Sequence, residues 1–326
     1  MRARGCFNDA TSTTGGSGIT QVQKGLQCES SSDPHTPMTP LRLTLLTALA
    51  MLAFAGNSLL CRLALKHTGI DAASFTAIRL LAGAVVLGLL VRVKHRAQHS
   101  EKAIDGSWWS ALALFAYAAG FSFAYISLSA ATGALLLFGA VQATMIGYGV
   151  WRGERLQGLQ LLGLLLALAG LVGLMLPGLS APPLLGSVLM LGAGMAWGVY
   201  SLRGKGASDP TRVTAGNFLR AVPIALALSL LMLSSMTLDG AGVMYAVLSG
   251  ALASGLGYAL WYTVLPAMKT THAATVQLSV PVIAAVGGIV VLGEPLSLRM
   301  VLASVAILGG IALVILEKKP APVRPA

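Results

Sequence analysis

The chain has 326 residues, of which 56% are hydrophobic and only 10% are Asp, Glu, Lys or Arg, whereas a soluble domain carries about 25% charged residues. The hydrophobic residues lie in successive blocks of about 20, each long enough to cross the roughly 30 Å hydrocarbon core of a bilayer. This composition excludes an ordinary soluble globular protein and indicates a chain that crosses the membrane many times.

Residues 1–40 precede the first hydrophobic block and are polar, rich in Ser, Thr and Gly. They contain no apolar run able to form a core, so we predict a disordered tail. No basic segment leads directly into an apolar stretch at the start of the chain, so this is no signal peptide, and Met38 is a natural alternative start of translation. Cys6, Cys28 and Cys61 indicate no disulfide or metal framework.

Ten hydrophobic blocks follow this tail. Most are apolar on all sides, which is typical of helices in lipid, and none shows the alternation of membrane strands. We therefore predict an all-α integral membrane protein with ten transmembrane helices. The predicted spans are residues 43–65, 72–92, 107–128, 133–151, 157–176, 184–203, 214–235, 243–265, 272–292 and 297–316.

The basic residues are distributed unevenly among the loops. Most of the Lys and Arg residues follow the second, fourth, sixth and eighth spans or lie in the terminal segment 318–326, while the other loops hold little more than Lys66 and Arg299. The positive-inside rule then places both termini in the cytoplasm. This asymmetry explains the formal net charge of +11 without nucleic acid, and we expect a multi-pass protein of the cytoplasmic (inner or plasma) membrane whose partner is the lipid bilayer.

A short pattern occurs twice: "VWRGERLQG" begins at Val150 and "VVLGEPLSL" begins at Val290. Flanking segments match at nearly the same offset, and one of these matches places Arg79 opposite Arg220. The similarity predicts two five-helix halves, residues 41–178 and 184–317. An odd number of spans makes the second copy enter the membrane from the opposite side, so the repeats are inverted.

The Gly-Glu pairs of this pattern, Gly153 with Glu154 and Gly293 with Glu294, join one span to the next. A carboxylate in the first turn of a helix interacts favourably with the helix dipole, by about 0.3–1 kcal/mol, and a preceding Gly permits a tight connection. We expect a local structural role for these residues rather than catalysis or ion coupling.

Several motifs together resemble the EamA family of the drug/metabolite transporter superfamily, over essentially all of residues 41–316. They are "AFAGNSLLCRLAL", "AIRLLAGAVVLGLL", "GERL", "GEPL", "GMAWGVYSL" and "SVPVIAAVGGIVVLGE". The resemblance implies ten helices in two inverted halves that move small metabolites by alternating access, often as an exporter of amino acids or related compounds. Pro281 matches a family position, but its counterpart in the first half is Val141, so we expect no such break in the fourth span.

Polar residues near the centres of spans are candidates for solute binding, because inverted-repeat transporters bind near the midplane. Asn57 and Gln142 are almost central and Gln277 is less so. An amide left facing lipid would cost several kcal/mol per unmet group. Each amide therefore either bonds to a neighbouring helix or lines a cavity, and the sequence leaves both interpretations open.

Aromatic residues with one polar atom suit a mixed solute. The spans that line the cavity in the family, namely the first, third, fourth, sixth, eighth and ninth, contribute the candidates Tyr117, Trp197, Tyr200 and Tyr258. Trp261 and Tyr262 also lie on such a span, but near its end, and we assign them to the interfacial belt that Trp and Tyr commonly form.

Arg62, Arg79 and Arg220 are the full charges well within spans. At a helix centre each would cost about 2.5–3.5 kcal/mol on insertion scales. Arg79 and Arg220 lie at similar depths from opposite membrane surfaces, close enough for each to extend toward the headgroups. The functional alternative is that these two residues attract an anionic group, such as a substrate carboxylate, from either side of the membrane.

No span carries an Asp or Glu at its centre, and no catalytic constellation or metal pair is present in the sequence, so we expect neither an enzyme nor a bound cofactor or metal. The sequence favours a transporter of small metabolites that exports amino acids or related compounds. The alternatives are a multidrug or cation efflux transporter and, less favoured, an intramembrane enzyme. The sequence does not identify the solute. It also leaves the oligomeric state open, with a homodimer as one alternative.

Overall fold

The structure is a computed structural model that describes residues 38–98, 105–153, 155–178, 181–204, 207, 209–268 and 270–316. Every regular element in these residues is helical, which confirms the all-α class. The predictions made for residues 1–37 and 317–326 and for Glu154 concern residues outside the described part of the chain, and the alternative start at Met38 stays a prediction.

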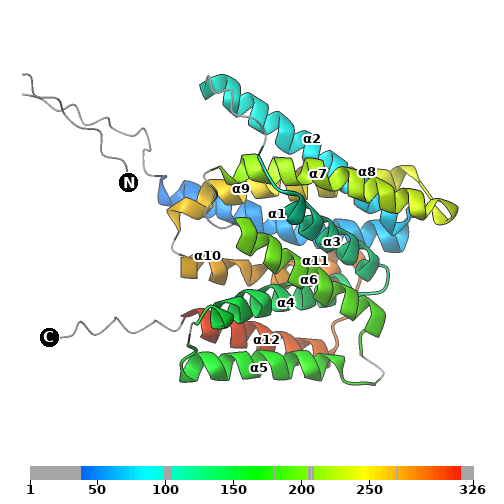
Figure 1. Cartoon of the computed structure of the whole chain (residues 1–326). Helices are drawn as coiled ribbons and strands as arrows, with labels where there is room; N and C mark the ends of the chain where they lie inside the picture. The colour runs from blue at the N-terminus through cyan, green and yellow to red at the C-terminus, as the bar shows by residue number, and fades with distance from the viewer. Residues whose placement is uncertain are drawn as a thin grey trace, which may run out of the picture. The chain divides into compact units, whose positions relative to one another are not determined.

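Helices follow one another with short connections (Figure 1). The first half of the chain forms α1 (Pro40–His67), α2 (Ala72–Gln98), α3 (Trp108–Tyr125), α4 (Ala130–Trp151) and α5 (Gly158–Met175). The second half forms α6 (Leu184–Gly204), α7 (Pro210–Leu231), α8 (Gly240–Leu248), α9 (Gly257–Val264), α10 (Thr270–Gln277), α11 (Ser279–Leu292) and α12 (Leu298–Leu316). Short 3₁₀ turns follow α7 (Leu233–Ser235) and α9 (Leu265–Ala267).

Within the described residues, nine helical segments are long and apolar enough to cross a membrane. The remaining predicted span corresponds to α3, whose 18 residues include several Trp, Tyr and Ser side chains. These side chains lower its hydropathy, but α3 packs against α6 and α7 inside the bundle. The chain is thus a multi-pass membrane protein, and the number ten remains a prediction.

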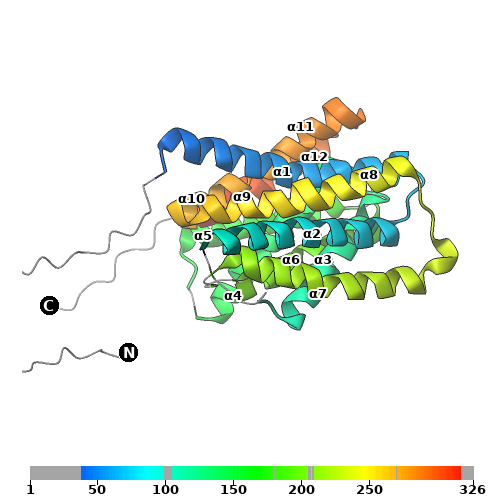
Figure 2. The same ribbon diagram turned by 90° about the horizontal axis from the view of Figure 1, so that it is seen from above.

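The helices form a bundle in which α1 begins and α12 ends at the same end (Figures 1 and 2). The packed pairs include α2 with α7, α4 with α11 and α5 with α12. Each of these pairs joins helices at equivalent positions of the two predicted halves. Such pairing is expected of related halves, while their inversion remains a prediction.

Two predicted spans are irregular in the second half of the chain. The eighth runs from α8 through a π-helical segment, η2 (Ser249–Leu256), into α9, and Gly250 in η2 lies directly against the backbone of Arg79 in α2. The ninth is interrupted at Leu278, between α10 and α11. Pro281 is the third residue of α11, where its missing N–H costs no helical hydrogen bond.

By contrast, α4 is continuous through Val141 and Gln142, so the two halves differ where the sequence departs from the family pattern. Both junction glycines have positive φ, +91° at Gly153 and +63° at Gly293, a conformation that favours glycine at a helix end.

Glu294 corrects the prediction made for its carboxylate. The helix that follows it begins only at Leu298, so the side chain is not in the first turn of that helix. Its Oε2 instead accepts a hydrogen bond of 2.8 Å from the backbone N–H of Ala130, the first residue of α4. The carboxylate thus meets the positive end of a different helix, one from the other half of the chain.

Candidate functional site

A cavity of about 520 Å³ lies inside the bundle, within the range of about 300–1,000 Å³ typical of small-molecule sites. Its lining comes from α1, α3, α4, α6, α7, η2, α9 and α10 and from the connections next to them. The exposed residues Gly204 and Pro266 belong to it, so the cavity opens where α6 ends. Thr47 near the start of α1 contacts Met268, also in the lining, which places this opening at the end where α1 begins.

All seven predicted solute-binding residues contribute to the lining of this one cavity. They are Asn57, Tyr117, Gln142, Trp197, Tyr200, Tyr258 and Gln277. The fold therefore brings together side chains that are far apart in the sequence. Their binding of a solute remains a proposal.

A chain of hydrogen bonds crosses the inner part of the cavity. Ser249 Oγ in η2 donates to Asn57 Oδ1 at 2.6 Å, and Asn57 Nδ2 donates to the hydroxyl of Tyr117 at 3.1 Å. Arg79 Nη2 in α2 lies 3.4 Å from the same hydroxyl. Asn57 is therefore part of a fixed network between α1, α3 and η2.

Gln142 is placed differently from Asn57. It is buried and lines the cavity. Within the described part of the chain, its amide makes no hydrogen bond, but the amide atoms are also not among the fully enclosed polar atoms that lack a partner. Its polar atoms thus face the cavity itself. Gln277 lines the cavity in α10, near the interruption at Leu278.

Aromatic rings form a nearly continuous wall on one side of the cavity. Trp197 stacks on Tyr258 with ring centroids 5.2 Å apart and an interplanar angle of 22°, and on Tyr200 at 5.3 Å and 30°. Tyr117 meets the same indole at 4.7 Å. The rings of such a wall can pack against flat apolar groups, and their hydroxyl and indole N–H groups can bond to a polar end.

At the end of the bundle opposite the cavity opening, charged side chains connect the helices. Arg62 Nε donates to Glu294 Oε1 at 2.9 Å, and Arg62 Nη1 donates to the carbonyl oxygens of Tyr125 and Ile126 at 2.8 and 3.0 Å. Both charged side chains are buried. Neither is part of the cavity lining.

Comparison with known proteins supplies the family. A family model described as "EamA-like transporter family" matches residues 184–316. A Pseudomonas aeruginosa protein described as "Uncharacterized protein PA1977" is 58% identical over 278 residues, which cover 85% of this chain and 96% of the relative. The chain belongs to the EamA-like transporter family. A solved structure described only as "Crystal structure of protein" matches with a TM-score of 0.60 at 20% identity, covering 83% of this chain and 96% of that one, and this likeness concerns the fold alone.

The resemblance seen in the sequence is thereby confirmed, and this EamA-family chain is a membrane transporter. The family match covers the predicted second half of the chain.

Two predictions about aromatic residues of this EamA-family chain are wrong. Trp261 is only 7% exposed, and both Trp261 and Tyr262 line the cavity, so they do not form an interfacial belt. Near a helix end, the side chain direction depends on helix rotation, which the sequence does not give. Tyr262 extends the aromatic wall, because its ring stacks on Tyr258 with centroids 6.3 Å apart.

The two arginines predicted as a symmetric pair have different surroundings. Arg79 is 2% exposed and points toward Tyr117 and Phe121, so it does not extend to the headgroups. Arg220 is partly exposed, and its Nη1 donates to the carbonyls of Asp105 and Gly216 at 3.1 Å each. The contacts of Arg220 thus hold the segment before α3, whereas Arg79 contacts Tyr117 in the cavity lining.

Sequence reasoning missed several polar residues of the site. Ser254 in η2 and Thr214 and Asn217 in α7 line the cavity, and Ser249 bonds to Asn57. The small-residue run "SGALASG" was the available signal for the two serines, because small residues permit close helix contacts in lipid.

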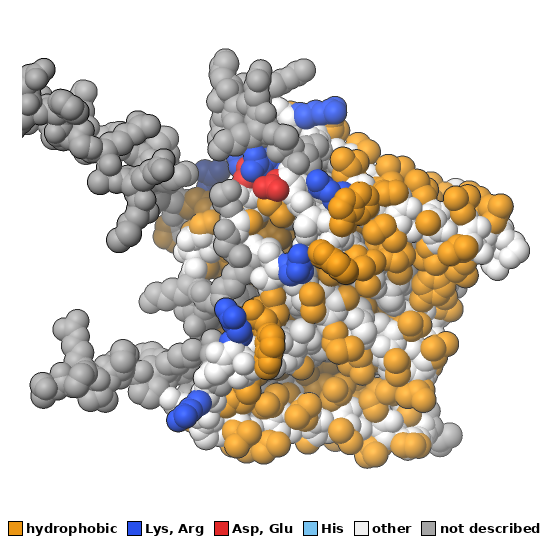
Figure 3. All heavy atoms as spheres, in the orientation of Figure 1, with side chains coloured by type: hydrophobic (Ala, Val, Ile, Leu, Met, Phe, Trp, Pro, Cys, Tyr) orange, Lys and Arg blue, Asp and Glu red, His pale blue; other side chains and the backbone are white. Residues whose placement is uncertain are grey.

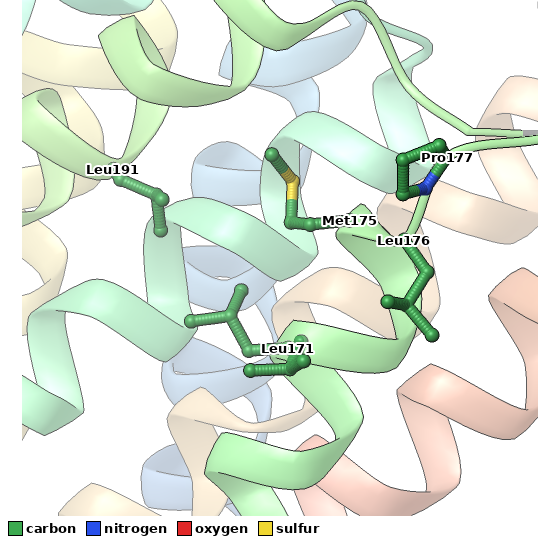
Figure 4. Close-up of a pocket in the computed structure, with 6 residues that line it drawn as sticks. Leu171, Met175, Leu176, Pro177 and Leu191 are labelled. Atoms are coloured by element: carbon green, nitrogen blue, oxygen red, sulfur yellow. The ribbon is translucent and has the colours of Figure 1, made fainter.

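A second pocket, of about 320 Å³, lies between the end of α5 and α6 (Figure 4). Its lining is apolar throughout and includes Leu171, Met175 and Leu191. It offers nothing to orient a polar solute. In the part of the chain that the structure describes, no cluster of three His, Cys, Asp or Glu residues is arranged to hold a metal ion.

Proposed function

We propose that this chain exports amino acids or related small metabolites across the cytoplasmic membrane by alternating access between two inverted five-helix halves. The observation that carries this proposal is the one-sided cavity. It extends from Asn57 at mid-helix to the exposed Gly204 and Pro266, whereas the buried pair of Arg62 and Glu294 holds the opposite end. A transporter in one of its two access states has this arrangement.

The distribution of charge supports an orientation for this state. Figure 3 shows blue Lys and Arg side chains mainly over the end of the bundle where α1 begins, and an orange hydrophobic surface over the rest of that face. By the positive-inside rule, that end faces the cytoplasm. The cavity then opens to the cytoplasm, where an exporter takes up its solute.

Efflux of cationic drugs is the principal alternative. A hydrophobic cation in a low-dielectric site favours an acidic side chain nearby. Among the described residues, the cavity lining contains no Asp or Glu, and the positive Arg79 contacts the lining residue Tyr117. These features favour a solute that is not a simple cation. Among the side chains that the structure describes, the lining also contains no His, and we propose that the solute gradient itself drives transport.

The test compares the culture medium of cells that overproduce the wild-type chain with that of cells that produce Gln142→Ala/Asn57→Ala at matched membrane levels. We expect at least one amino acid or related metabolite to accumulate outside only with wild type. Gln160→Ala serves as the control, because this amide bonds to Val314 outside the cavity. Equal export by the double variant would overturn the site, and an unchanged medium with wild type would overturn export.

A further inference from the structure

Arg79 carries a buried charge that forms no ion pair with any acidic side chain that the structure describes. Among the described residues, the buried charged side chains are Arg62, Arg79 and Glu294. Arg62 and Glu294 pair with each other, so the positive charge of Arg79 is uncompensated. Its Nη1 has no hydrogen-bond partner, and its Nη2 makes only a long contact of 3.4 Å. A guanidinium ion in a low-dielectric interior is stable only when anionic or hydrogen-bonding groups replace its lost water.

The hydrogen bonds beside Arg79 all run in one direction. Ser249 donates to Asn57, and Asn57 donates to Tyr117. The Tyr117 hydroxyl thus accepts from both Asn57 and Arg79. Since a hydroxyl has two lone pairs and one proton, the Tyr117 proton is left to donate outward. A chain of donors polarised in this way strengthens its last member.

Tyr117, the residue that carries this last donor, lines the cavity together with Asn57. The guanidinium carbon of Arg79 lies 5.6 Å from the ring centroid of Tyr117 and 5.0 Å from that of Phe121, and both rings line the same cavity. The positive charge is therefore directly behind the wall that carries the free hydroxyl proton. A ligand atom placed against Tyr117 must accept a hydrogen bond, and negative charge on it is stabilised.

The remaining lining specifies the rest of the ligand. Apart from its amides and hydroxyls, it consists of apolar and aromatic side chains, chiefly the wall around Trp197 and Tyr258. No lining residue that the structure describes carries a formal charge, so no second charged group of the ligand has an ionic partner.

We propose that Arg79, acting through Tyr117 and Asn57, forms a carboxylate subsite, and that the solute is a carboxylate with an apolar or aromatic body. This inference rests on the proposed function and names the substrate class of the same cavity. The carboxylate accepts the Tyr117 proton, and its charge neutralises Arg79. The body lies on the aromatic wall.

The test uses three probes with one body and different head groups: 3-phenylpropanoate, 3-phenylpropanamide and 3-phenylpropylamine. Binding to the purified full chain in phosphatidylcholine nanodiscs is measured by calorimetry. We expect the carboxylate to bind about 10- to 100-fold more tightly than the amide, the range of hydrogen bonds to charged groups, and the amine to bind weakest. Equal affinities for carboxylate and amide, or no binding of the carboxylate at millimolar concentration, would overturn the subsite.

Variants test which residue is responsible for the preference for a carboxylate. Arg79→Gln should reduce carboxylate affinity to that of the amide and leave amide affinity unchanged, and Arg79→Lys should keep part of the preference because it keeps the charge. Arg220→Gln is the matched control, since that arginine bonds to the carbonyls of Asp105 and Gly216 and is not part of the lining, and it should bind as wild type. A carboxylate preference that survives in correctly folded Arg79→Gln would overturn the role of Arg79.

Failure of this inference can be distinguished from failure of the proposed function. Export of a neutral or cationic metabolite, with no carboxylate preference in nanodiscs, would sustain transport and reject the subsite. Selective carboxylate binding without flux of the bound probe in proteoliposomes would sustain the subsite and reject transport of that solute.

Discussion

Arg62 and Glu294 lie 232 residues apart in the sequence and form a buried ion pair in which Nε and Oε1 are 2.9 Å apart. Each partner also forms hydrogen bonds with backbone groups at the end of a helix. Arg62 donates to the last carbonyls at the end of α3, and Glu294 accepts from the first amide of α4. Positive charge at a helix C-terminus and negative charge at an N-terminus are both favourable. The pair thus fastens the turn between α3 and α4 to the junction between α11 and α12.

Removing one member of this pair should destabilise the protein strongly, because it leaves the other charge buried and unpaired. We expect Glu294→Met or Arg62→Met to cost about 3–5 kcal/mol, seen as a lower unfolding temperature in detergent. The double variant Arg62→Met/Glu294→Met should lose much less than the sum of the single losses. Strictly additive losses would show that the two side chains do not interact.

Asn57 and Gln142 should behave differently although both carry an amide at the cavity. Asn57→Ala removes a partner from both Ser249 and Tyr117, and each stranded polar group costs about 1–3 kcal/mol, so this variant should lose stability and transport. Gln142→Ala breaks no hydrogen bond that the structure shows, and should lose transport at nearly wild-type stability. Thermal unfolding and export measured on the same preparations separate the two effects. Equal destabilisation by both variants would contradict the distinction.

Gly250→Ala should disturb the contact between η2 and α2. A Cβ at this position would overlap the backbone of Arg79, and overpacking of this kind typically costs about 1–3 kcal/mol. Gly88→Ala is the matched control within α2, because nothing lies within 4 Å of its added carbon. We expect a clear fall in unfolding temperature for the first variant and none for the second. A stable Gly250→Ala protein would mean that the two helices can separate without cost.

The connections before α2 and before α8 interlock through two aspartates. Asp71 accepts hydrogen bonds from the backbone N–H groups of Ser74, in the helix that follows it, and of Thr237, in the other connection, at 2.9 and 3.0 Å. Asp239 in turn accepts from the backbone N–H of Gly69 and caps α8. Partial burial raises the pKa of Asp71, but the hydrogen bonds from Ser74, Thr237 and Ala73 outweigh it, so that the pKa lies below its ordinary value.

This shift predicts an acid-sensitive contribution to stability. Because the pKa of Asp71 is lowered on folding, its contribution is fully present above the unfolded pKa of about 3.9 and is lost as the pH falls through the folded value. Asp71→Asn should remove this part of the pH dependence and lower stability near neutral pH by about 1 kcal/mol, as for loss of a helix cap. Unfolding midpoints measured at several pH values test this. Parallel curves for variant and wild type would contradict it.

The spans were predictable from the sequence because hydrophobic blocks of bilayer length are a strong signal. The irregular parts were less so. Pro281 indicated an interruption in the ninth span, but the helix breaks three residues earlier, at Leu278, since proline is accepted in the first turn of the helix that follows. The π-helical segment Ser249–Leu256 had no signal beyond its small residues.

For the candidate site, the sequence predicted which residues belong to it better than it predicted the direction in which their side chains point. Central amides and aromatics could be selected by depth, and Asn57, Gln142 and Tyr117 do line one cavity. Whether Trp261 faces lipid or the cavity depends on helix rotation. The partner of Glu294 depends on which distant helix ends meet, and periodicity contains neither kind of information.

The uncompensated charge of Arg79 has an electrical consequence for a transporter of carboxylates. The empty binding site carries one positive charge, and the occupied site is neutral. A membrane potential, negative inside, therefore acts on the reorientation of the empty protein and not on that of the loaded one. It is worth about 2.3 kcal/mol per elementary charge per 100 mV, scaled by the fraction of the field that the guanidinium crosses. The potential favours the empty site facing the cytoplasm, so an energised membrane returns the exporter to the side where it binds the next solute.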